Sequence, residues 1–253
     1  MMKNLANRAS IDRPWMQYYP PQMAQLQIPE CTLYDYIKST CPGMDVAAMN
    51  YYGTDITWEE VFKEVEEVAK ALKAVGFGKE DQIPVFLQSV PQFISLLLAA
   101  EKIGASLLCR DNTIEENAEA VKKSGAKVII AHDFLSKEEM NVYMKDAGVE
   151  KIILLSPYYM ADRDTMPDYI EAAIEAKYTE CSAQGPATMT WKEFLGLGEQ
   201  YTGVVEETAD INRPLFRAYT SGSTGPSKQV IHSAYTMLGI IFQMSPYGVS
   251  DGF

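Results

Sequence analysis

The sequence predicts an α/β protein, a three-layer αβα sandwich with a largely parallel sheet. Short runs of Val, Ile and Leu recur between residues 83 and 155, and stretches with helical spacing separate them. The runs are nearly continuous, which is typical of strands buried on both faces. The helical stretches begin at Ser or Thr caps, and several end at glycine. We therefore expect βα units with helices on each side of the sheet.

The regular elements begin with a capping box, in which Thr57 opens a helix and Glu60 reaches back to it. Apolar residues then recur at helical spacing up to Gly76. The elements predicted next are strand 83–87, helix 93–103 ended by Gly104, strand 105–109, a helix from Thr113 to Gly125, strand 127–131, a helix opened at Ser136 and strand 151–155. This order repeats a βαβ unit.

Residues 156–214 are less regular, with an exposed helix expected over 168–178 and a second capping signal at Thr190. The linker that follows carries Glu206, Glu207 and Asp210. A solvated acidic linker explains these charges better than a metal site, so we assign them no role.

The last predicted elements are a strand beginning at Val230 and a helix capped by Ser233. The apolar residues of this helix, for which we expect core packing rather than substrate contact, are Met237, Ile240, Ile241 and Met244.

We divide the chain into a proline-rich leading arm (1–30), a first α/β subdomain (31–205) and the start of a second subdomain (206–253). Prolines break any helix in the arm. Its aromatic residues are expected to pack on the domain surface, and they include Trp15, Tyr18 and Tyr19.

Composition excludes several functions. The net charge of −12 argues against non-specific binding to nucleic acid or an anionic membrane. The longest apolar run, 93–100, is too short to span a bilayer, so we expect a cytoplasmic protein. The four cysteines are widely spaced and the chain has only two histidines, which favours reduced thiols over a zinc site.

One stretch, residues 219–233, carries the chemistry. Its two glycines allow positive φ, so the backbone N–H groups can turn inward around an anion. Neighbouring hydroxyl groups can donate hydrogen bonds to phosphate, and Lys228 adds a mobile positive charge. A solvated Ser/Gly turn remains the alternative. The spacing does not fit a Walker phosphate loop or a nucleophile elbow, so the serines are predicted to be ligands rather than nucleophiles.

This stretch resembles the phosphate-loop signature of the adenylate-forming superfamily, and acyl-CoA synthetases are the most similar branch. Two positions depart from the family pattern, Ser227 in place of proline and Gln229 in place of glycine. Segments 78–85, 91–93, 102–105 and 124–129 are similar to the family's scaffold, so the resemblance covers roughly 50–245. It implies that the ligands of the ATP phosphates are Thr220, Ser221, Gly222, Ser223, Thr224, Gly225 and Lys228.

The resemblance also implies a function. An acyl-CoA synthetase activates a carboxylic acid, here expected to be a fatty acid, as an acyl-adenylate and then transfers the acyl group to CoA. ATP, Mg²⁺ and CoA are the expected cofactors and substrates. The catalytic lysine and the magnesium-binding acid are expected beyond Phe253, in the missing C-terminal half, so this part alone is expected to be inactive.

Two alternatives stay open, a non-enzymatic nucleotide-binding or interaction module and a peptide-synthetase-type adenylation domain. His232 lies where relatives often place histidine, and we interpret it as structural.

Overall fold

The computed structural model describes residues 12–18, 27–110, 113–180, 187–220 and 227–244. It confirms the α/β sandwich, built around a seven-stranded sheet in the order β7-β6-β5-β3-β4-β8-β9. The strands are β3 (Gln82–Phe86), β4 (Ser106–Cys109), β5 (Val128–His132), β6 (Lys151–Leu155), β7 (Thr188–Thr190), β8 (Phe216–Tyr219) and β9 (Gln229–His232). The helices beside them are α3 (Trp58–Ala74), α4 (Gln92–Ile103), α5 (Ile114–Ser124), α6 (Lys137–Asp146), α7 (Asp168–Glu180), α8 (Trp191–Glu199) and α9 (Ala234–Met244).

The sheet is parallel from β7 to β8, and only β9 runs antiparallel to its neighbour. The chain starts at β3, places β4 on one side, crosses back to β5 on the other, and returns after β7 to put β8 beside β4. The carboxyl ends of β3, β4, β5 and β8 therefore meet at one edge. In open α/β sheets this edge is where ligands bind.

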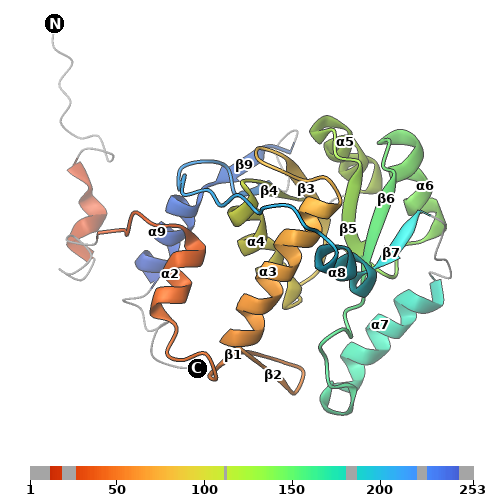
Figure 1. Cartoon of the computed structure of the whole chain (residues 1–253), viewed down its shortest axis with the longest axis horizontal. Helices are drawn as coiled ribbons and strands as arrows, with labels where there is room; N and C mark the ends of the chain where they lie inside the picture. The colour runs from red at the N-terminus through yellow and green to blue at the C-terminus, as the bar shows by residue number, and fades with distance from the viewer. Residues whose placement is uncertain (1–11, 19–26, 111–112, 181–186, 221–226, 245–253) are drawn as a thin grey trace, which may run out of the picture.

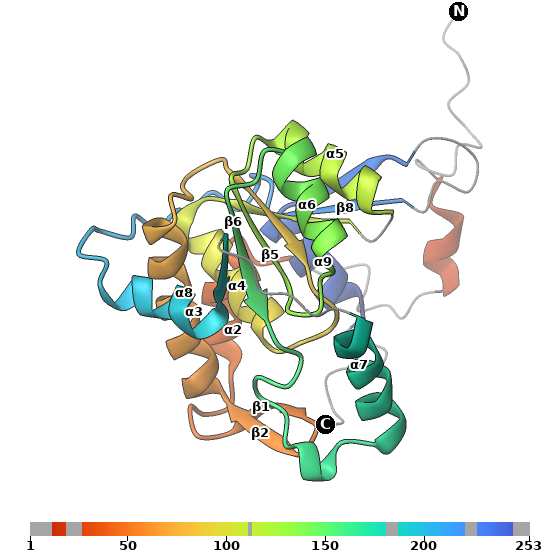
Figure 2. The same ribbon diagram turned by 90° about the vertical axis from the view of Figure 1, so that its right-hand side faces the viewer.

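Helices cover both faces of the sheet (Figures 1 and 2). On one face, α3, α4 and α8 pack over a core that includes Ile130 and Ile153. On the other face, α5 and α6 pack over the alternate residues of the same strands, Ile129 and Ile152. Because successive side chains of a strand point to opposite faces, these continuous apolar runs fill both cores.

The helices begin and end at the capping residues from which their boundaries were predicted. Thr57 and Glu60 form the capping box of α3, and Ser136 and Thr190 form equivalent boxes at α6 and α8. Helix α4 ends at Gly104, whose φ of 81° lies in the left-handed region that glycine adopts without strain.

Helix α2 (Leu33–Thr40), the hairpin of β1 (Ala47–Tyr51) and β2 (Thr54–Thr57), and the edge strand β7 were not predicted. Each of these elements is too short for the spacing of its apolar residues to indicate a helix or a strand. Helix α2 is fixed instead by distant groups, since the buried Glu101 carboxylate accepts hydrogen bonds of 2.8 Å from the amides of Leu33 and Tyr34.

The leading arm contains a 3₁₀ helix, η1 (Pro14–Tyr18), and a second one, η3 (Arg163–Thr165), precedes α7. The expected surface packing is wrong for Tyr18, which is 82% exposed. Tyr19 and the side chain of Trp15 lie outside the described residues.

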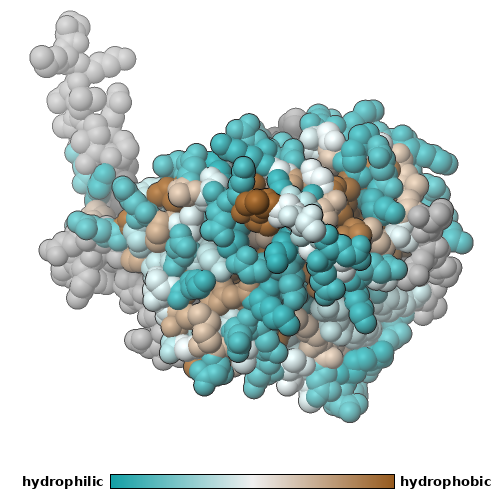
Figure 3. Space-filling view, in the orientation of Figure 1, coloured by the Kyte–Doolittle hydropathy of each residue, from teal (hydrophilic) through white to brown (hydrophobic). Residues whose placement is uncertain are grey.

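The face of the molecule shown in Figure 3 is largely hydrophilic, as expected for a chain in which 22% of residues are charged. Among the described residues, none of the helices is long and apolar enough to cross a membrane. Cys31, Cys41 and Cys109 are free thiols, and burial raises the pKa of Cys109 to about 12.

Candidate functional site

The predicted phosphate loop leaves the sheet at its carboxyl edge. Strand β8 is parallel to β4 and antiparallel to β9, so the loop connects two adjacent strands of a hairpin. The strands on both sides of the loop were predicted, and both are present. The sheet therefore fixes the two ends of the loop.

The base of the loop is closed by three hydrogen bonds. The Thr220 amide donates to the Lys228 carbonyl at 2.9 Å, and the Lys228 amide donates to the Thr220 hydroxyl at 3.0 Å. The Ser227 hydroxyl donates to the Thr220 carbonyl at 2.6 Å. The Thr220 hydroxyl accepts in this arrangement, so its own proton is available to a phosphate oxygen.

The structure thus brings two of the predicted ligands, Thr220 and Lys228, to the same point. The other predicted ligands lie outside the described residues, and they are Ser221, Gly222, Ser223, Thr224 and Gly225. Their assignment stays a prediction.

Lys228 is exposed, and its ammonium group takes part in none of the ion pairs found among the described residues. Two guanidinium groups lie nearby, although the chain as a whole carries a net charge of −12. Arg110 stacks on the ring of Tyr219, and Arg217 hydrogen-bonds Gln229 on the facing strand. Burial lowers the pKa of Arg217, while the Tyr219 hydroxyl opposes this shift. Arg110 is paired with Glu116, so Lys228 and Arg217 supply the positive charge that the described residues leave without an ion-pair partner at the loop base.

Ser227 and Gln229, the two departures from the family pattern, both make hydrogen bonds at the loop. A proline at 227 has no hydroxyl to donate, and a glycine at 229 has no side chain. The Gln229 amide donates to the Tyr219 hydroxyl at 3.1 Å and accepts from Arg217 at 3.3 Å. Sequence reasoning assigned no role to these residues or to Arg110. For Gln229, the sequence did contain a signal of a specific role, because a polar side chain stands where the family usually has glycine.

His132 ties three strands together at the same edge. Its Nε2 accepts a hydrogen bond of 2.7 Å from the Gln88 amide, which leaves Nδ1 to donate to the Leu155 carbonyl at 3.2 Å. Burial lowers the pKa of this imidazole, so the neutral form that these two bonds require is favoured. His132 holds the loop after β3 to β5 and β6, a structural role.

His232, the other histidine, also fits its structural interpretation. It belongs to β9, its carbonyl accepts from the Leu215 amide at 2.8 Å, and its ring lies 6.3 Å from that of Phe216.

A cavity of about 530 Å³ opens at the carboxyl edge near β4. It is lined mainly by apolar groups from β1, from the start of α4 and from the loop before that helix: Met49, Tyr51, Leu87, Val90, Pro91, Phe93, Ile94 and Cys109. Its polar lining is Asn50, Gln88 and Ser89. With no cationic side chain in this lining, the cavity suits an apolar group rather than a phosphate.

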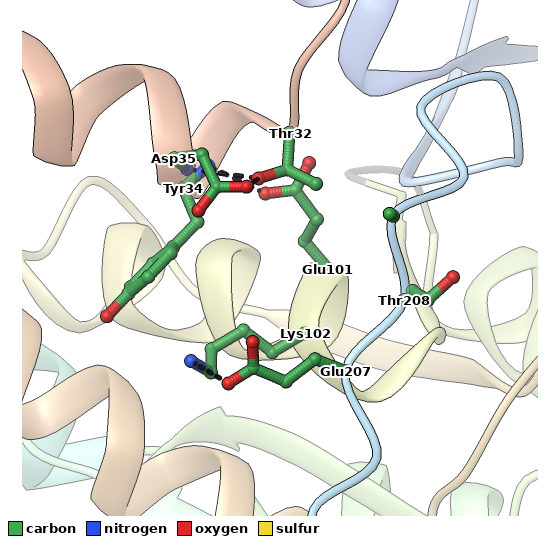
Figure 4. Close-up of a pocket in the computed structure, with 8 residues that line it drawn as sticks. Thr32, Tyr34, Asp35, Glu101, Lys102, Glu207 and Thr208 are labelled. Atoms are coloured by element: carbon green, nitrogen blue, oxygen red, sulfur yellow. Dashed lines mark hydrogen bonds and ion pairs between the residues drawn. The ribbon is translucent and has the colours of Figure 1, made fainter.

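A smaller cavity of about 110 Å³ lies at the opposite end of α4, where the acidic linker passes (Figure 4). There the buried Lys102 ammonium lies 2.7 Å from both Glu207 and Glu66. Glu207 is therefore not merely solvated, as the sequence had indicated, because it anchors the linker to α4. The sequence could not show this pairing, since 105 positions separate the two charges.

The exposure of α9 contradicts a second expectation, that its apolar residues pack in the core. Met237 packs against the core, but Ile240, Ile241 and Met244 are 51%, 42% and 49% exposed. Only one side of this apolar helix faces the described part of the molecule, where Leu238 is fully buried. Core packing is thus wrong for three of the four residues.

The residues present offer no fit for magnesium. Within the described ranges, no three His, Cys, Asp or Glu side chains gather closely enough to hold a metal ion. We therefore derive no step through Mg²⁺ from these residues.

The fold and the position of the loop define an open α/β protein that is doubly wound, with its candidate site at the carboxyl edge. The chain belongs to the AMP-binding enzyme family, whose model matches residues 40–252.

Among curated relatives, the chain is 27% identical over 200 residues to 3-hydroxypropionyl-coenzyme A synthetase of Metallosphaera sedula, covering 78% of this chain and 29% of the relative. It is 30% identical over 184 residues to acetyl-coenzyme A synthetase of Emericella nidulans, covering 72% and 26%. The chain therefore spans less than a third of the length of these relatives.

Solved structures support the fold. The anthranilate CoA ligase AuaEII in complex with anthranoyl-AMP aligns with a TM-score of 0.59 at 15% identity, over 84% of this chain and 36% of that one. ATP-bound MatB from Rhodopseudomonas palustris aligns with a TM-score of 0.56 at 16% identity, over 85% and 37%.

Proposed function

We propose that this chain is the N-terminal part of an ATP-dependent acid–CoA ligase. The observation that carries the proposal is the loop base, where the Lys228 backbone amide donates to the Thr220 hydroxyl at the carboxyl edge of the sheet, so that both predicted ligands start from one point. Membership of the AMP-binding family supports it, as do relatives that are acyl-CoA synthetases.

In the proposed reaction, a carboxylate oxygen of the acid attacks the α-phosphorus of ATP. The bond from this phosphorus to the bridging oxygen breaks, which gives acyl-adenylate and pyrophosphate. The CoA sulfur then attacks the acyl carbon, and AMP leaves. Mg²⁺, held by residues elsewhere in the enzyme, would screen the charge of the phosphates when bound.

The role proposed for the loop is electrostatic. Thr220, Lys228 and the predicted ligands between them hold the β- and γ-phosphates and stabilise the charge that develops on the leaving pyrophosphate. Donors fixed in advance at such a position are usually the largest catalytic contribution. The closed loop base supplies that fixation for Thr220 and Lys228.

We propose a small carboxylic acid as the substrate, rather than the fatty acid expected from sequence. The support is that the relatives described above are synthetases of acetyl-CoA and 3-hydroxypropionyl-CoA. We also propose that the remainder of the enzyme packs on the exposed apolar side of α9, and that residues 1–253 alone have no ligase activity.

Pyrophosphate exchange tests this function. The natural gene product that carries these residues is incubated with ATP, Mg²⁺, labelled pyrophosphate and acids ranging from acetate to long-chain fatty acids. We expect label to enter ATP with a short acid. Absence of exchange with every acid contradicts the proposal and favours the nucleotide-binding module.

In the same protein, Lys228→Ala is expected to lower kcat for exchange about 10²-fold, or about 3 kcal/mol of barrier, by analogy with the loss of one oxyanion donor. The matched control is Lys192→Ala, which removes an exposed lysine from α8. Equal kcat values for Lys228→Ala and the control would remove Lys228 from the mechanism.

A further inference from the structure

Tyr219, the last residue of β8, is held on two sides immediately before the phosphate loop. The Arg110 guanidinium lies over its ring, 4.5 Å from the centroid. The Gln229 side chain donates to its hydroxyl at 3.1 Å. An aromatic ring fixed both at its face and at its hydroxyl keeps one orientation.

Arg110 is itself fixed before it meets Tyr219. It directly follows β4, its side chain is only 9% exposed, and it makes two contacts with α5. One terminal nitrogen donates to the Glu116 carbonyl at 3.1 Å, and the other lies 3.3 Å from the Glu116 carboxylate. A guanidinium held in this way stays close to the face of the ring, where a cation is attracted by the ring's negative face.

Gln229 is fixed from the opposite side. Its carbonyl oxygen accepts from Arg217 at 3.3 Å, and Arg217 in turn donates to the Ser106 hydroxyl on β4 at 3.0 Å. Gln229 and Tyr219 are also direct partners across the β8–β9 ladder. One contact to Tyr219 comes from Arg110, directly after β4, and the other is connected through Gln229 and Arg217 to Ser106 on β4. Strand β4 lies inside the sheet, between β3 and β8.

Thr220 follows Tyr219 directly, and it closes the loop base with Lys228. Tyr219 and Gln229 form the ladder pair that adjoins Thr220 and Lys228, so contacts that hold this pair also hold the backbone from which the two predicted ligands project. We propose that Arg110 and Gln229 are positioning residues that act through Tyr219 to hold the loop base, so that Thr220 and Lys228 are placed to bind the ATP phosphates. This proposal rests on the function proposed above.

A second Arg–Tyr stack in the chain provides the control. Arg163 lies 4.3 Å from the ring centroid of Tyr158 and pairs with Glu171 and Glu175, but its side chain is 51% exposed and it belongs to the segment before α7. Its contacts are of the same kind as those of Arg110, and among the described residues they join it to Tyr158 and α7 rather than to the loop base. Arg163→Met therefore tests the loss of such a stack in general.

The experiment uses the natural gene product that carries these residues. Pyrophosphate exchange gives KM for ATP and for the acid, calorimetry gives the affinity for inorganic tripolyphosphate, and hydrogen exchange follows the amides of 216–220 and 228–232. For Arg110→Met we expect a KM for ATP and a Kd for tripolyphosphate about tenfold higher, an unchanged KM for the acid, and faster exchange of these amides. Arg163→Met should match the wild type in all of these measurements.

Combined variants test whether Arg110 acts through Tyr219. If it does, Arg110→Met in a Tyr219→Leu background adds nothing further, whereas additive effects would mean direct contact with phosphate and overturn the proposal. Gln229→Gly, which restores the usual family residue, should reproduce part of the loss. Arg110→Lys keeps the charge, so it should fold more readily than Arg110→Met. A rise in the Kd for tripolyphosphate in both variants supports the proposal, and wild-type values in both overturn it.

The outcomes separate this proposal from the proposed function. If the wild type neither exchanges pyrophosphate nor binds tripolyphosphate, the proposed function fails and the positioning role falls with it. If the wild type does both and Arg110→Met equals Arg163→Met, only the positioning role is wrong.

Discussion

Three buried charged residues on α3 and α4 show how this fold accommodates charge at the level of single side chains. Glu64 accepts a hydrogen bond of 2.6 Å from the Ser95 hydroxyl, and Glu101 accepts from two amides of α2. Burial raises the pKa of both carboxyl groups, and these hydrogen bonds oppose the shift. Lys102, the third, is paired with two glutamates. Each charge is compensated by a partner from another element, so together they join α2, α3, α4 and the acidic linker.

Replacing Lys102 tests how much these contacts between elements stabilise the protein. Its side chain is 6% exposed, while its partners Glu66 and Glu207 are 45% and 67% exposed and can regain water. We expect Lys102→Met to lower the free energy of unfolding by about 1 to 2 kcal/mol, less than for a fully buried pair because of that solvent screening. Proteolysis within 206–210 should also become faster.

The control for this change is Lys63→Met, which removes an exposed i,i+4 pair with Glu67 at 3.8 Å. It should cost under about 0.5 kcal/mol in urea denaturation. Equal losses for the two variants would show that the buried pair is worth no more than a surface one.

Between elements, α8 packs closely against the backbone of α3. A Cβ added at Gly198 would lie 2.8 Å from both the Ala71 nitrogen and the Glu67 carbonyl oxygen. The same helix carries Gly196, where an added Cβ would meet nothing within 4 Å. Gly198 therefore allows the backbones of two helices to approach closely, whereas Gly196 faces open space and has no such packing role.

These glycines give a paired prediction. Gly198→Ala should destabilise the protein by about 2 kcal/mol, because backbone atoms cannot yield as a flexible side chain can. Gly196→Ala should stabilise it by up to about 1 kcal/mol, because alanine is the better helix former. Thermal and urea unfolding measure both. Effects of the same sign in the two variants would contradict the packing argument.

For the whole molecule, the sheet topology gathers the loop base, the apolar cavity and His132 at one edge. The apolar side of α9 and the exposed Val230 and Ile231 of β9 lie at the end of the sheet order, where the described chain provides no further strand. The relatives described above are more than three times as long as the segment they share with this chain. This unpaired end is where we place the rest of the enzyme.

Charged substitutions on α9 test that placement. In residues 1–253 alone, Ile240→Glu should change the free energy of unfolding by less than about 0.5 kcal/mol, because the side chain is already half exposed. In the longer natural gene product it should cost about 2 kcal/mol or more, because a charge would be buried. Leu238→Ala, on the buried side of α9, should cost about 3 kcal/mol in both. A small effect of Ile240→Glu in both proteins would place the remaining chain elsewhere.

The sequence predicted most of the fold because its signals are local. Capping residues such as Thr57 and Ser136 act within one turn, and buried parallel strands need continuous apolar runs. It missed α2, whose first amides are satisfied by Glu101, 67 to 68 positions away. It also misjudged α9, since an apolar helix does not say which of its sides meets the rest of the chain.

For the candidate site, the sequence by itself determined the chemistry: small hydroxyl residues, two glycines and Lys228 between two strands. Only the tertiary structure decided what contacts the residue before that loop, because Arg110 is brought to Tyr219 by the parallel pairing of β4 with β8. Residue types and their short-range spacing can be identified from the sequence directly. Contacts between strands whose paired residues are 109 positions apart depend on the order in which the sheet assembles, and that order follows from the packing of the whole domain.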